Sequence, residues 1–411
     1  MPEFLSLLPP DDALALLVSH LPAPAFSTEQ VDTASALGCV TASAVMAPEA
    51  LPAFSRSTVD GYAVRARDTF GASDSLPAYL TLAGEVPMGA APAFPVGAGQ
   101  AAVIHTGGML PEGADAVVML EYTQAARPGE IEVMRPVAPG ENELRAGEDV
   151  QVGQVVIPAG RRLRPAEIGG LMALGITRVA VVRPPRVGIL SSGDEVIDPA
   201  QVPTPGQVRD INSYTQSALV QRVGGEPVRY GIIPDRRETL EAIMRQALAE
   251  CDLVVITAGS SASTRDLTSE VIDRMGAPGV LVHGVNVKPG KPTILAVCDG
   301  KPVIGLPGNP VSALVIAGLF VAPVVERLLG LPEGKSRPSV MAKLSVNLPS
   351  QAGREDWSPV RLVPGPRGLV ADPIFYKSNL IFTLSQADGL VRTPPDATGL
   401  EAGADVQVFF F

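Results

Sequence analysis

Strand-like and helix-like segments alternate between residues 186 and 329, and this pattern constrains the fold more than any other feature of the sequence. The strand-like runs are short and rich in β-branched residues, whereas the longer runs repeat apolar residues at helical spacing. Strands are predicted at 186–190, 228–233, 253–257, 280–287, 293–297 and 302–306, and helices at 212–223, 237–250, 267–275 and 311–329. Such alternation predicts a mostly parallel sheet, which binds ligands beyond the carboxyl ends of its strands.

The flanking sequence has a different character and predicts further domains. Apolar residues at helical spacing predict helices at 11–20 and 28–45. Residues 51–139 are rich in Gly, Pro and short β-type runs. Strands at 150–157 and 179–182 flank a short helix at 165–174, and these pieces can rejoin the N-terminal helices. Short strands after residue 331, such as 340–346, 360–363 and 406–410, predict a small β-barrel or sandwich.

The predicted fold class is therefore multidomain α/β, which suits a chain of 411 residues that is too long for one core. Its centre is a mostly parallel, three-layer α/β domain at 184–330. A mixed, discontinuous N-terminal domain comprises 1–50 and 140–183, and a β-rich domain at 51–139 is inserted into it. A C-terminal β-domain, a small β-barrel or sandwich, follows at 331–411.

Charge and composition exclude several classes of function. The net charge of −11 argues against a nucleic-acid surface, whose affinity comes largely from Lys and Arg. Three scattered His make a His/Cys metal site improbable, and three distant Cys in apolar surroundings are typical of buried thiols in a reducing compartment. The N-terminus has no basic region of a signal peptide. The apolar run at 311–325 contains Pro323, so we expect a buried helix rather than a membrane span, and a cytoplasmic protein.

The segment Gly305–Ala313, GLPGNPVSA, joins a predicted buried strand to the long helix. Gly308 can take a positive φ, Asn309 can cap the helix, and Pro310 suits the first helical turn. A strand that leads directly into a helix N-terminus can bind an anion through free N–H groups and the helix dipole. On its own, this segment is more often a structural turn than a ligand site.

Polar loops follow other strands of the same predicted sheet. Ser191-Ser192-Gly193-Asp194-Glu195 pairs a Gly turn with two carboxylates, and 257–263 is a Gly/Ser loop followed by Asp266. Such loops can cradle phosphate, and carboxylates tolerate phosphate when a cation such as Mg²⁺ lies between them. Each loop alone is explained by an N-cap or a solvated turn. Because they meet at one sheet edge, we favour a ligand site, to which Lys288 and Lys291 of KPGKP add two cations.

Motifs of other common enzyme classes are absent from the sequence. There is no GxSxG, P-loop lysine motif, HExxH or GxGxxG before a helix. This argues against a serine hydrolase, a P-loop NTPase, a zincin and an ordinary dinucleotide dehydrogenase.

The ordered set of motifs resembles the molybdopterin molybdenumtransferases, the molybdenum-cofactor insertion enzymes related to the E domain of gephyrin. The motifs are FSRSTVDGYAV (54–64), HTGGMLPEGADAVVMLE (105–121), PGENELRAGED (139–149), GILSSGDEV (188–196), KPGKP (288–292) and GLPGNPVSA (305–313), and SNLIFTLSQADGLVRTP (378–394) is similar to the family's C-terminal β-domain. The resemblance spans nearly the whole chain. It implies that molybdate is inserted into adenylylated molybdopterin with Mg²⁺-dependent loss of AMP.

The resemblance also implies residue roles and partners. The expected catalytic acids are Asp60, Asp149, Glu195 and Asp266, of which Asp60, Glu195 and Asp266 would bind metal. The expected substrate-binding residues are Thr106, Ser192, Gly193, Asp194, Asp235, Gly259, Ser261, Lys288, Lys291, Pro307, Gly308, Asn309, Pro310 and Ser312. The family forms elongated homodimers, with the cleft between the α/β domain of one subunit and the N-terminal domains of the other. Molybdopterin adenylyltransferase and cofactor-accepting enzymes are expected partners, whereas nucleic acid and membrane are not.

Two departures from the family pattern lie near the expected ligand. The usual SGGVSxG loop is Thr257-Ala258-Gly259-Ser260-Ser261-Ala262-Ser263 here, and a lysine found four residues before KPGKP in some members is replaced by Gly284. These changes are compatible with a paralogue that prefers tungstate. Two more hypotheses are a noncatalytic, gephyrin-like scaffold and a related pterin- or nucleotide-binding hydrolase. The retained acids argue against the scaffold, and the N-terminal DGYA and GED motifs argue against the hydrolase.

Overall fold

The computed structural model describes residues 7–257, 262–332 and 337–410, with side chains from 262 to 266 outside the description. The chain forms two compact units. The large unit comprises 1–29, 38–42 and 180–411, and the small unit comprises 30–37 and 43–179. Strands β1 (Thr28–Asp32) and β12 (Arg178–Val182) each contain a point at which the chain passes from one unit to the other. The division into four domains stays a prediction.

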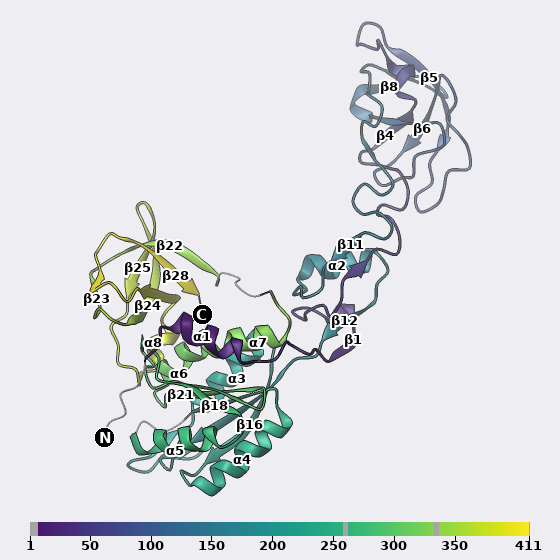
Figure 1. Ribbon diagram of the computed structural model, residues 1–411. Coiled ribbons are helices and arrows are strands. Elements are labelled where there is room, and N and C mark those ends of the chain that lie inside the picture. The colour runs from purple at the N-terminus through teal and green to yellow at the C-terminus, as the bar shows by residue number, and fades with distance from the viewer. Residues whose placement is uncertain (1–6, 258–261, 333–336, 411) are drawn as a thin grey trace. The chain divides into compact units, whose positions relative to one another are not determined.

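A six-stranded sheet forms the centre of the large unit (Figure 1). Its order is β16 (Glu226–Ile233), β13 (Arg186–Ser192), β17 (Leu253–Thr257), β21 (Lys301–Leu306), β20 (Ile294–Cys298) and β18 (Pro278–His283). The first four strands are parallel to one another, and only β20 runs against its neighbours. The prediction of a mostly parallel sheet is confirmed.

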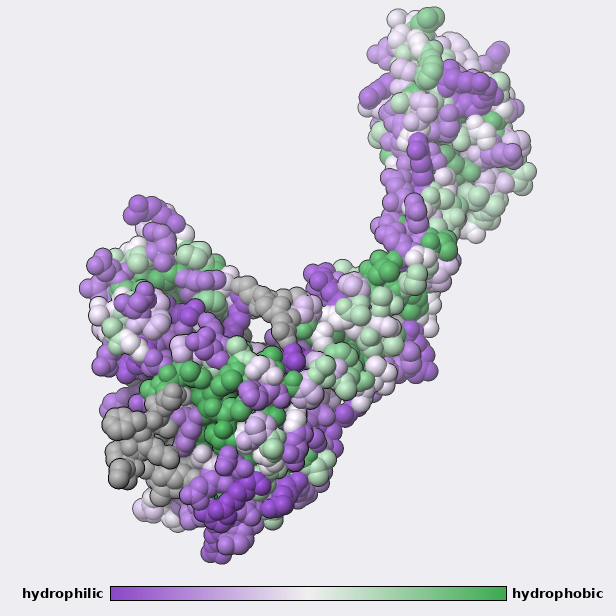
Figure 2. Space-filling view, in the orientation of Figure 1, coloured by the Kyte–Doolittle hydropathy of each residue, from purple (hydrophilic) through white to green (hydrophobic). Residues whose placement is uncertain are grey.

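Helices cover both faces of this sheet and make three layers, because successive residues of a strand point to opposite faces. On β17, Val255 packs into one core with α3 (Asn212–Val223) and α6 (Pro310–Ile316). Its neighbours Val254 and Ile256 pack into the other core with α4 (Arg237–Glu250) and α5 (Ala262–Asp273). The first core also contains α1 (Pro10–Ser19) and α7 (Ala322–Leu328). The outer face of α4 is hydrophilic (Figure 2), as its amphipathic pattern predicts.

The last helical segment is continuous from Pro310 to Leu328, with a π-helical turn at Ala317–Val321. It is the one described helix long and apolar enough to cross a membrane by length and composition. Most of it is buried, and residues such as Phe320 are fully enclosed in the core of the large unit. It is a core helix here, as expected from the sequence.

A second six-stranded sheet in the large unit contains the C-terminal strands. Strands β24 (Glu355–Gly365), β25 (Gly368–Pro373), β22 (Ser339–Leu344), β28 (Asp405–Phe410) and β26 (Gly389–Thr393) follow in order, and β26 pairs with β24 to close a barrel. The short strand β19 (Val287–Lys288) extends it beside β24. Smaller elements are β14 (Val196–Ile197) with β15 (Val208–Arg209), β23 (Leu348–Pro349) with β27 (Gly399–Leu400), and α8 (Phe382–Ser385).

The small unit is built on a third six-stranded sheet. Its order is β7 (Ala116–Met119), β4 (Gly61–Val64), β6 (Gln100–Ile104), β5 (Ala78–Glu85), β9 (Glu130–Val133) and β8 (Thr123–Arg127). Two short pairs join β2 (Val45–Met46) to β11 (Val155–Ile157) and β3 (Arg56–Ser57) to β10 (Glu143–Leu144). Helix α2 (Pro165–Ala173) and the 3₁₀ turns Thr33–Ser35, Ala66–Thr69 and Leu120–Tyr122 complete it.

Three local predictions are wrong. The expected helix at 28–45 is instead β1, a 3₁₀ turn and irregular chain, because Thr28, Val31 and Thr33 are β-branched and Gly38 takes a φ of +81°. The strand expected at 150–157 begins only at Val155. The strand expected at 280–287 divides into β18 and β19 around Gly284, whose φ is +104°.

The free thiols differ in burial. Cys251 and Cys298 are buried, whereas Cys39 is only half-buried, so the expectation of three buried thiols holds for two. Burial in the apolar core raises the pKa of Cys251 and raises that of Cys298 to about 12.

Candidate functional site

A polar cavity of about 450 Å³ lies at the carboxyl edge of the central sheet. We call it the sheet-edge cavity. The predicted site residues that line it are Ser192, Glu195, Gly308, Asn309 and Pro310. The other lining residues are Ser191, Val196, Val208, Arg209, Asp210, Ile211, Asn212, Thr257 and Asn379. The strands β13, β17 and β21 end here side by side, so the loops after β13 and β21 meet at this edge as expected. Lys288 and Lys291 do not line this cavity, and most of the Gly/Ser loop lies outside the described residues.

Predicted residues after β13 and β16 contact one another. The Ser192 hydroxyl donates to the carboxylate of Asp235, and the Asp235 N–H donates to Asp194 Oδ1 over 3.2 Å. The Gly193 N–H donates to the carbonyl of Ile233 over 3.3 Å. These contacts tie the two turns together and fix the positions of the carboxylates.

Glu195 is the half-buried carboxylate in the wall of the sheet-edge cavity. Within the described ranges its carboxylate makes no hydrogen bond or ion pair. Mg²⁺ is usually held by one or two carboxylates together with phosphate oxygens and water. An uncommitted carboxylate in a polar cavity therefore fits Mg²⁺, although the described residues hold no cluster of three or more His, Cys, Asp or Glu side chains arranged for a metal.

Asp210 is a buried carboxylate of this cavity that the sequence prediction missed. It is 6% exposed, and its Oδ1 accepts from the Ser191 hydroxyl at 3.0 Å and from the Ser213 N–H at 3.1 Å. Its Oδ2 accepts from the Ser213 hydroxyl at 2.6 Å. Asp210 thereby caps the first turn of α3 and links it to the end of β13. The sequence feature that could have identified Asp210 is an Asp two residues before a predicted helix.

Asn212, also missed, offers an oriented acceptor. Its Nδ2 donates to the carbonyl of Gly308 over 2.8 Å, which fixes the amide plane. Its Oδ1 is buried and has no hydrogen-bond partner in the described part of the chain. A buried acceptor without a donor is costly, so Oδ1 is placed to accept an N–H or O–H from a ligand or water.

A second polar cavity of about 540 Å³ lies between the central sheet and the C-terminal barrel, and we call it the lysine cavity. The predicted residues Lys288, Lys291, Pro307, Asn309 and Ser312 line it. Lining residues that the sequence prediction missed include Arg354, Asp356, Trp357, Tyr376 and Ser378. They lie on the barrel, and no local motif links them to the sheet. Asn309 lines both cavities and is the residue at which they adjoin.

The KPGKP loop is held rigidly beside this cavity. The carbonyl of Lys291 accepts from the Val285 and Thr293 N–H groups, both at 2.9 Å. Gly290 has a φ of +113°, and a Cβ at this position would lie 2.2 Å from Cγ1 of Ile316. Only glycine fits such a close approach to α6.

The GLPGNP turn differs from its prediction in three respects. Asn309 stands at the N-cap position of α6, but its side chain makes no capping bond and donates instead to Ser378 Oγ over 3.1 Å. Gly308 does not take a positive φ. The Val311 N–H, which we expected to be free for an anion, donates to the Ser378 carbonyl over 3.1 Å. Pro310 occupies the first helical turn as predicted.

In the small unit, Asp60 and Thr106 lie together. Asp60 Oδ1 accepts from the Thr106 N–H at 2.7 Å and from its hydroxyl at 3.1 Å. These two hydrogen bonds, and the nearby His105, lower the pKa of Asp60 below its ordinary value. His105 Nδ1 is 3.8 Å from Asp60, and its Nε2 is 3.3 Å from Glu85. Asp60 is exposed and ionised, as a metal-binding carboxylate must be.

Asp149, the other predicted acid of the small unit, makes no contact with Asp60 within the described ranges. Asp149 is exposed, and its N–H donates to the carbonyl of Leu51 over 3.0 Å. Gly259 and Ser261 lie outside the described residues. Asp266 belongs to α5, but its side chain is outside the description too.

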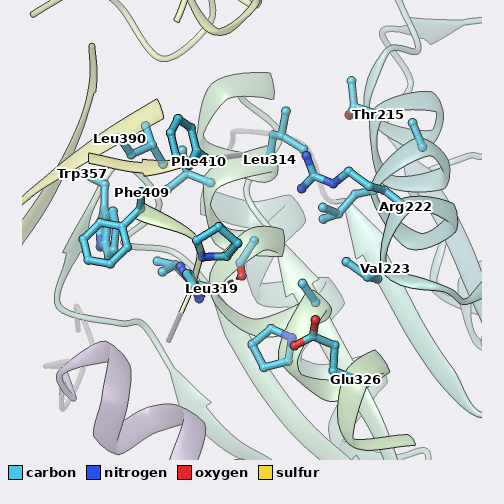
Figure 3. Close-up of a pocket in the computed structure, with 18 residues that line it drawn as sticks. Thr215, Arg222, Val223, Leu314, Leu319, Glu326, Trp357, Leu390, Phe409 and Phe410 are labelled. Carbon is cyan, nitrogen blue, oxygen red and sulfur yellow. Dashed lines mark hydrogen bonds between the residues drawn. The ribbon is translucent and has the colours of Figure 1, made fainter. Parts of the chain in front are cut away.

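A third cavity, of about 440 Å³, is largely apolar (Figure 3). Leu314 and Leu319 of the last helix line it together with Trp357 and Phe409 of the barrel. Arg222 reaches in from α3. None of the predicted site residues lines this cavity.

Comparisons with known proteins cover almost the entire chain. Residues 8–175 match the MoeA N-terminal region (domain I and II), residues 188–327 match a probable molybdopterin binding domain, and residues 341–411 match the MoeA C-terminal region (domain IV). The molybdopterin molybdenumtransferase of Nostoc sp. is 34% identical over 93% of this chain and 88% of its own length. That of Haemophilus influenzae is 33% identical over 94% of this chain and 97% of its own length.

Solved structures agree with the sequence comparisons. A crystal structure of the molybdopterin biosynthesis MoeA protein from Pyrococcus horikoshii has a TM-score of 0.86 at 33% identity and covers 99% of this chain and 100% of that chain. The fold, the order of the matched regions and the identity over most of the chain lead to one conclusion. The chain belongs to the MoeA family, whose curated members include molybdopterin molybdenumtransferases.

Proposed function

We propose that this protein is a molybdopterin molybdenumtransferase that inserts molybdate into adenylylated molybdopterin and releases AMP in a Mg²⁺-dependent reaction. Family membership over more than nine-tenths of the chain supports a transferase of molybdenum-cofactor biosynthesis. The substrates and the release of AMP are the finer part of the proposal.

One observation carries this proposal: two polar cavities of opposite charge adjoin at Asn309. The charged residues in the wall of the sheet-edge cavity are Glu195, Asp210 and Arg209, with a formal charge of −1. Those of the lysine cavity are Lys288, Lys291, Arg354 and Asp356, with a formal charge of +2. The proposed reaction joins a nucleotide-linked pterin and a small oxyanion. Adjoining cavities would hold these two substrates close to one another, which lowers the entropic cost of their reaction.

The residues of the lysine cavity would bind the oxyanion. Lys288 and Lys291 supply charge, and Ser312 supplies a hydroxyl from the first turn of α6. Pro307 and Pro310 flank Asn309 and would keep the floor between the cavities rigid. Asn309 and Gly308 lie where the two substrates would meet.

The sheet-edge cavity would hold the nucleotide-linked part. Ser192, Gly193, Asp194 and Asp235 form the linked turns that follow β13 and β16. Asn212 presents a buried acceptor to an N–H of the ligand. Mg²⁺, when bound near Glu195, would neutralise phosphate oxygens. The carboxylates would hold and orient rather than attack.

Several parts of the proposal rest on the family resemblance. Asp60, Asp149 and Asp266 are proposed as catalytic acids, and Asp60 and Asp266 as further metal ligands. Thr106, which donates to Asp60, and Gly259 and Ser261 are proposed substrate-binding residues. We also propose a cytoplasmic homodimer that receives its pterin from molybdopterin adenylyltransferase and passes the cofactor to accepting enzymes.

The decisive experiment incubates the purified protein with Mg²⁺, molybdate and adenylylated molybdopterin and measures AMP and active cofactor. We expect both products, and neither when molybdate or Mg²⁺ is omitted. Tight pterin binding without AMP would replace the proposal by the noncatalytic scaffold. Faster AMP release with tungstate in direct competition would identify the tungstate-preferring paralogue.

A further inference from the structure

Asp356 is a buried carboxylate in the wall of the lysine cavity, where an anionic ligand is proposed to bind. It is 3% exposed. Its Oδ1 accepts from Arg354 Nε at 2.9 Å, and its Oδ2 lies 3.7 Å from Lys288 Nζ. A buried negative charge beside an anion site opposes the ligand, so its presence there requires an explanation.

The backbone fixes Asp356 opposite Lys288. Strands β19 and β24 pair in parallel, with Lys288 in register with Asp356. The KPGKP loop of the sheet domain is therefore joined to the barrel at the very residues that form the ion pair. The backbone of Asp356 cannot move away from the cavity without breaking this pairing.

Arg354 and Lys288 differ in how strongly they interact with Asp356. Arg354 makes a charge-assisted hydrogen bond, whereas Lys288 is beyond hydrogen-bond distance and its side chain is 55% exposed. Lys288 therefore has the freedom to swing on its flexible stem while Arg354 stays in place. Lys291, the other lysine of the loop, makes no ion pair in the described part of the chain.

We propose that Asp356 is a built-in counter-ion of Lys288, and that Lys288 leaves Asp356 and pairs with the oxyanion when the oxyanion binds. Without ligand, Asp356 holds Lys288 at the cavity wall; when an oxyanion enters, Lys288 turns to it and Arg354 continues to neutralise Asp356. Asp356 is thus a positioning residue that acts through Lys288. The inference rests on the proposed function, because it takes the lysine cavity as the oxyanion site.

The charge of the cavity agrees with a dianionic ligand. Three cationic side chains, Lys288, Lys291 and Arg354, and one carboxylate, Asp356, leave the described wall with a formal charge of +2. A tetrahedral dianion such as molybdate, tungstate or sulfate matches this charge. Asp356 lowers the affinity for such an ion, which favours its release to the second substrate over tight storage.

The test measures binding of molybdate and of unreactive sulfate to the full-length protein by titration calorimetry. Asp356→Asn keeps the shape but removes the charge, and we expect it to tighten dianion binding about fivefold, because Lys288 no longer gives up a partly exposed ion pair when it turns to the ligand. Lys288→Met should weaken binding. In the double variant the gain from Asp356→Asn should largely disappear, because the freed lysine is gone.

Asp405→Asn is the matched control, since it breaks an exposed ion pair with Lys343 on the same barrel at 2.8 Å and should not change binding. A purely structural Asp356 would give weaker binding in Asp356→Asn, and additive effects in the double variant would also overturn the exchange. Should Asp356→Asn fail to fold, Lys288→Met and Lys291→Met decide. Lys288 must break an ion pair to bind, so its loss should weaken binding less than the loss of Lys291, and the reverse order refutes the proposal.

The outcomes also separate this inference from the proposed function. If the unaltered protein binds neither molybdate nor sulfate, the lysine cavity is not an oxyanion site and both ideas fail there. If it binds them and releases AMP, but Asp356→Asn does not bind more tightly, only the counter-ion role fails.

Discussion

Gly290→Ala should destabilise the large unit and displace the KPGKP loop. The added Cβ would lie 2.2 Å from Cγ1 and 2.4 Å from Cδ1 of Ile316, which is fully buried and cannot turn away freely. The backbone there has a φ of +113°, which L-residues other than glycine rarely adopt.

The magnitude follows from these two costs. Holding a non-glycine residue in a sparsely populated backbone region costs about 1–3 kcal/mol. Overpacking a close-packed core costs a further amount of about 1–3 kcal/mol. We therefore expect the free energy of unfolding of the large unit to fall by about 2–6 kcal/mol.

The assay is urea denaturation followed by tryptophan fluorescence. Trp357 is the only tryptophan, is buried in the large unit and therefore reports on its unfolding. Gly368→Ala is the control, because Gly368 has a similar φ of +119° but nothing within 4 Å of the added Cβ. The difference between the two variants isolates the contact with Ile316.

A second substitution, Ile316→Ala, tests whether the contact with Ile316 causes the loss of stability in Gly290→Ala. Ile316→Ala removes both clashing atoms, so it should cost less in the Gly290→Ala background than in the unaltered protein. If Gly290→Ala is no more destabilising than Gly368→Ala, the contact with Ile316 does not cause the loss of stability. The same follows if the effects of Gly290→Ala and Ile316→Ala on the free energy of unfolding are additive. Sulfate binding should weaken in Gly290→Ala and return in part when Ile316→Ala is added.

Three further substitutions test individual carboxylates. Asp60→Asn should abolish AMP release without changing the melting temperature, and retained turnover would contradict the role of Asp60. Hydrogen bonds from Thr106 lower the pKa of Asp60 below 3.8. Protonation of Asp60 should therefore cause no loss of activity between pH 8 and about 5. Glu167, whose pKa is lowered to about 2 chiefly by Arg164, also accepts from the Arg164 N–H at 3.0 Å and caps α2. Glu167→Gln should therefore lower calorimetric stability above pH 4.5 by about 1 kcal/mol, a difference that vanishes as the pH falls from 4.5 towards 2. Asp210→Ala should cost about 1–3 kcal/mol in the fluorescence assay, since it leaves buried hydroxyl and N–H donors unpaired, and an unchanged unfolding midpoint would refute that account.

The sequence predicted the central domain well because its signals are local. The helices at 212–223 and 237–250 have the predicted bounds, since each lies between turn residues and repeats apolar side chains at helical spacing. The helix predicted at 28–45 failed because spacing alone does not separate a helix from irregular chain when β-branched residues and a glycine interrupt it.

The site was predicted in part for a similar reason. Residues that follow strands, such as Glu195 and Asn309, were found because parallel strands end at one edge. Arg354 and Asp356 were missed because they reach the lysine cavity only through the pairing of β19 with β24, across many residues of chain. Ser378 was missed as a partner of Asn309 because neither residue's local sequence specifies the other.

The burial of two cysteines has a consequence for the proposed reaction, whose metal is thiophilic. A thiol coordinates metal and reacts with oxidants as its thiolate, and with a pKa of about 12 Cys298 is ionised in roughly one molecule in 10⁵ at neutral pH. Burial raises the pKa of Cys251 as well, which likewise favours its neutral thiol. Within the described residues, the buried cysteines of the large unit therefore offer almost no thiolate to compete with the dithiolene of the proposed substrate.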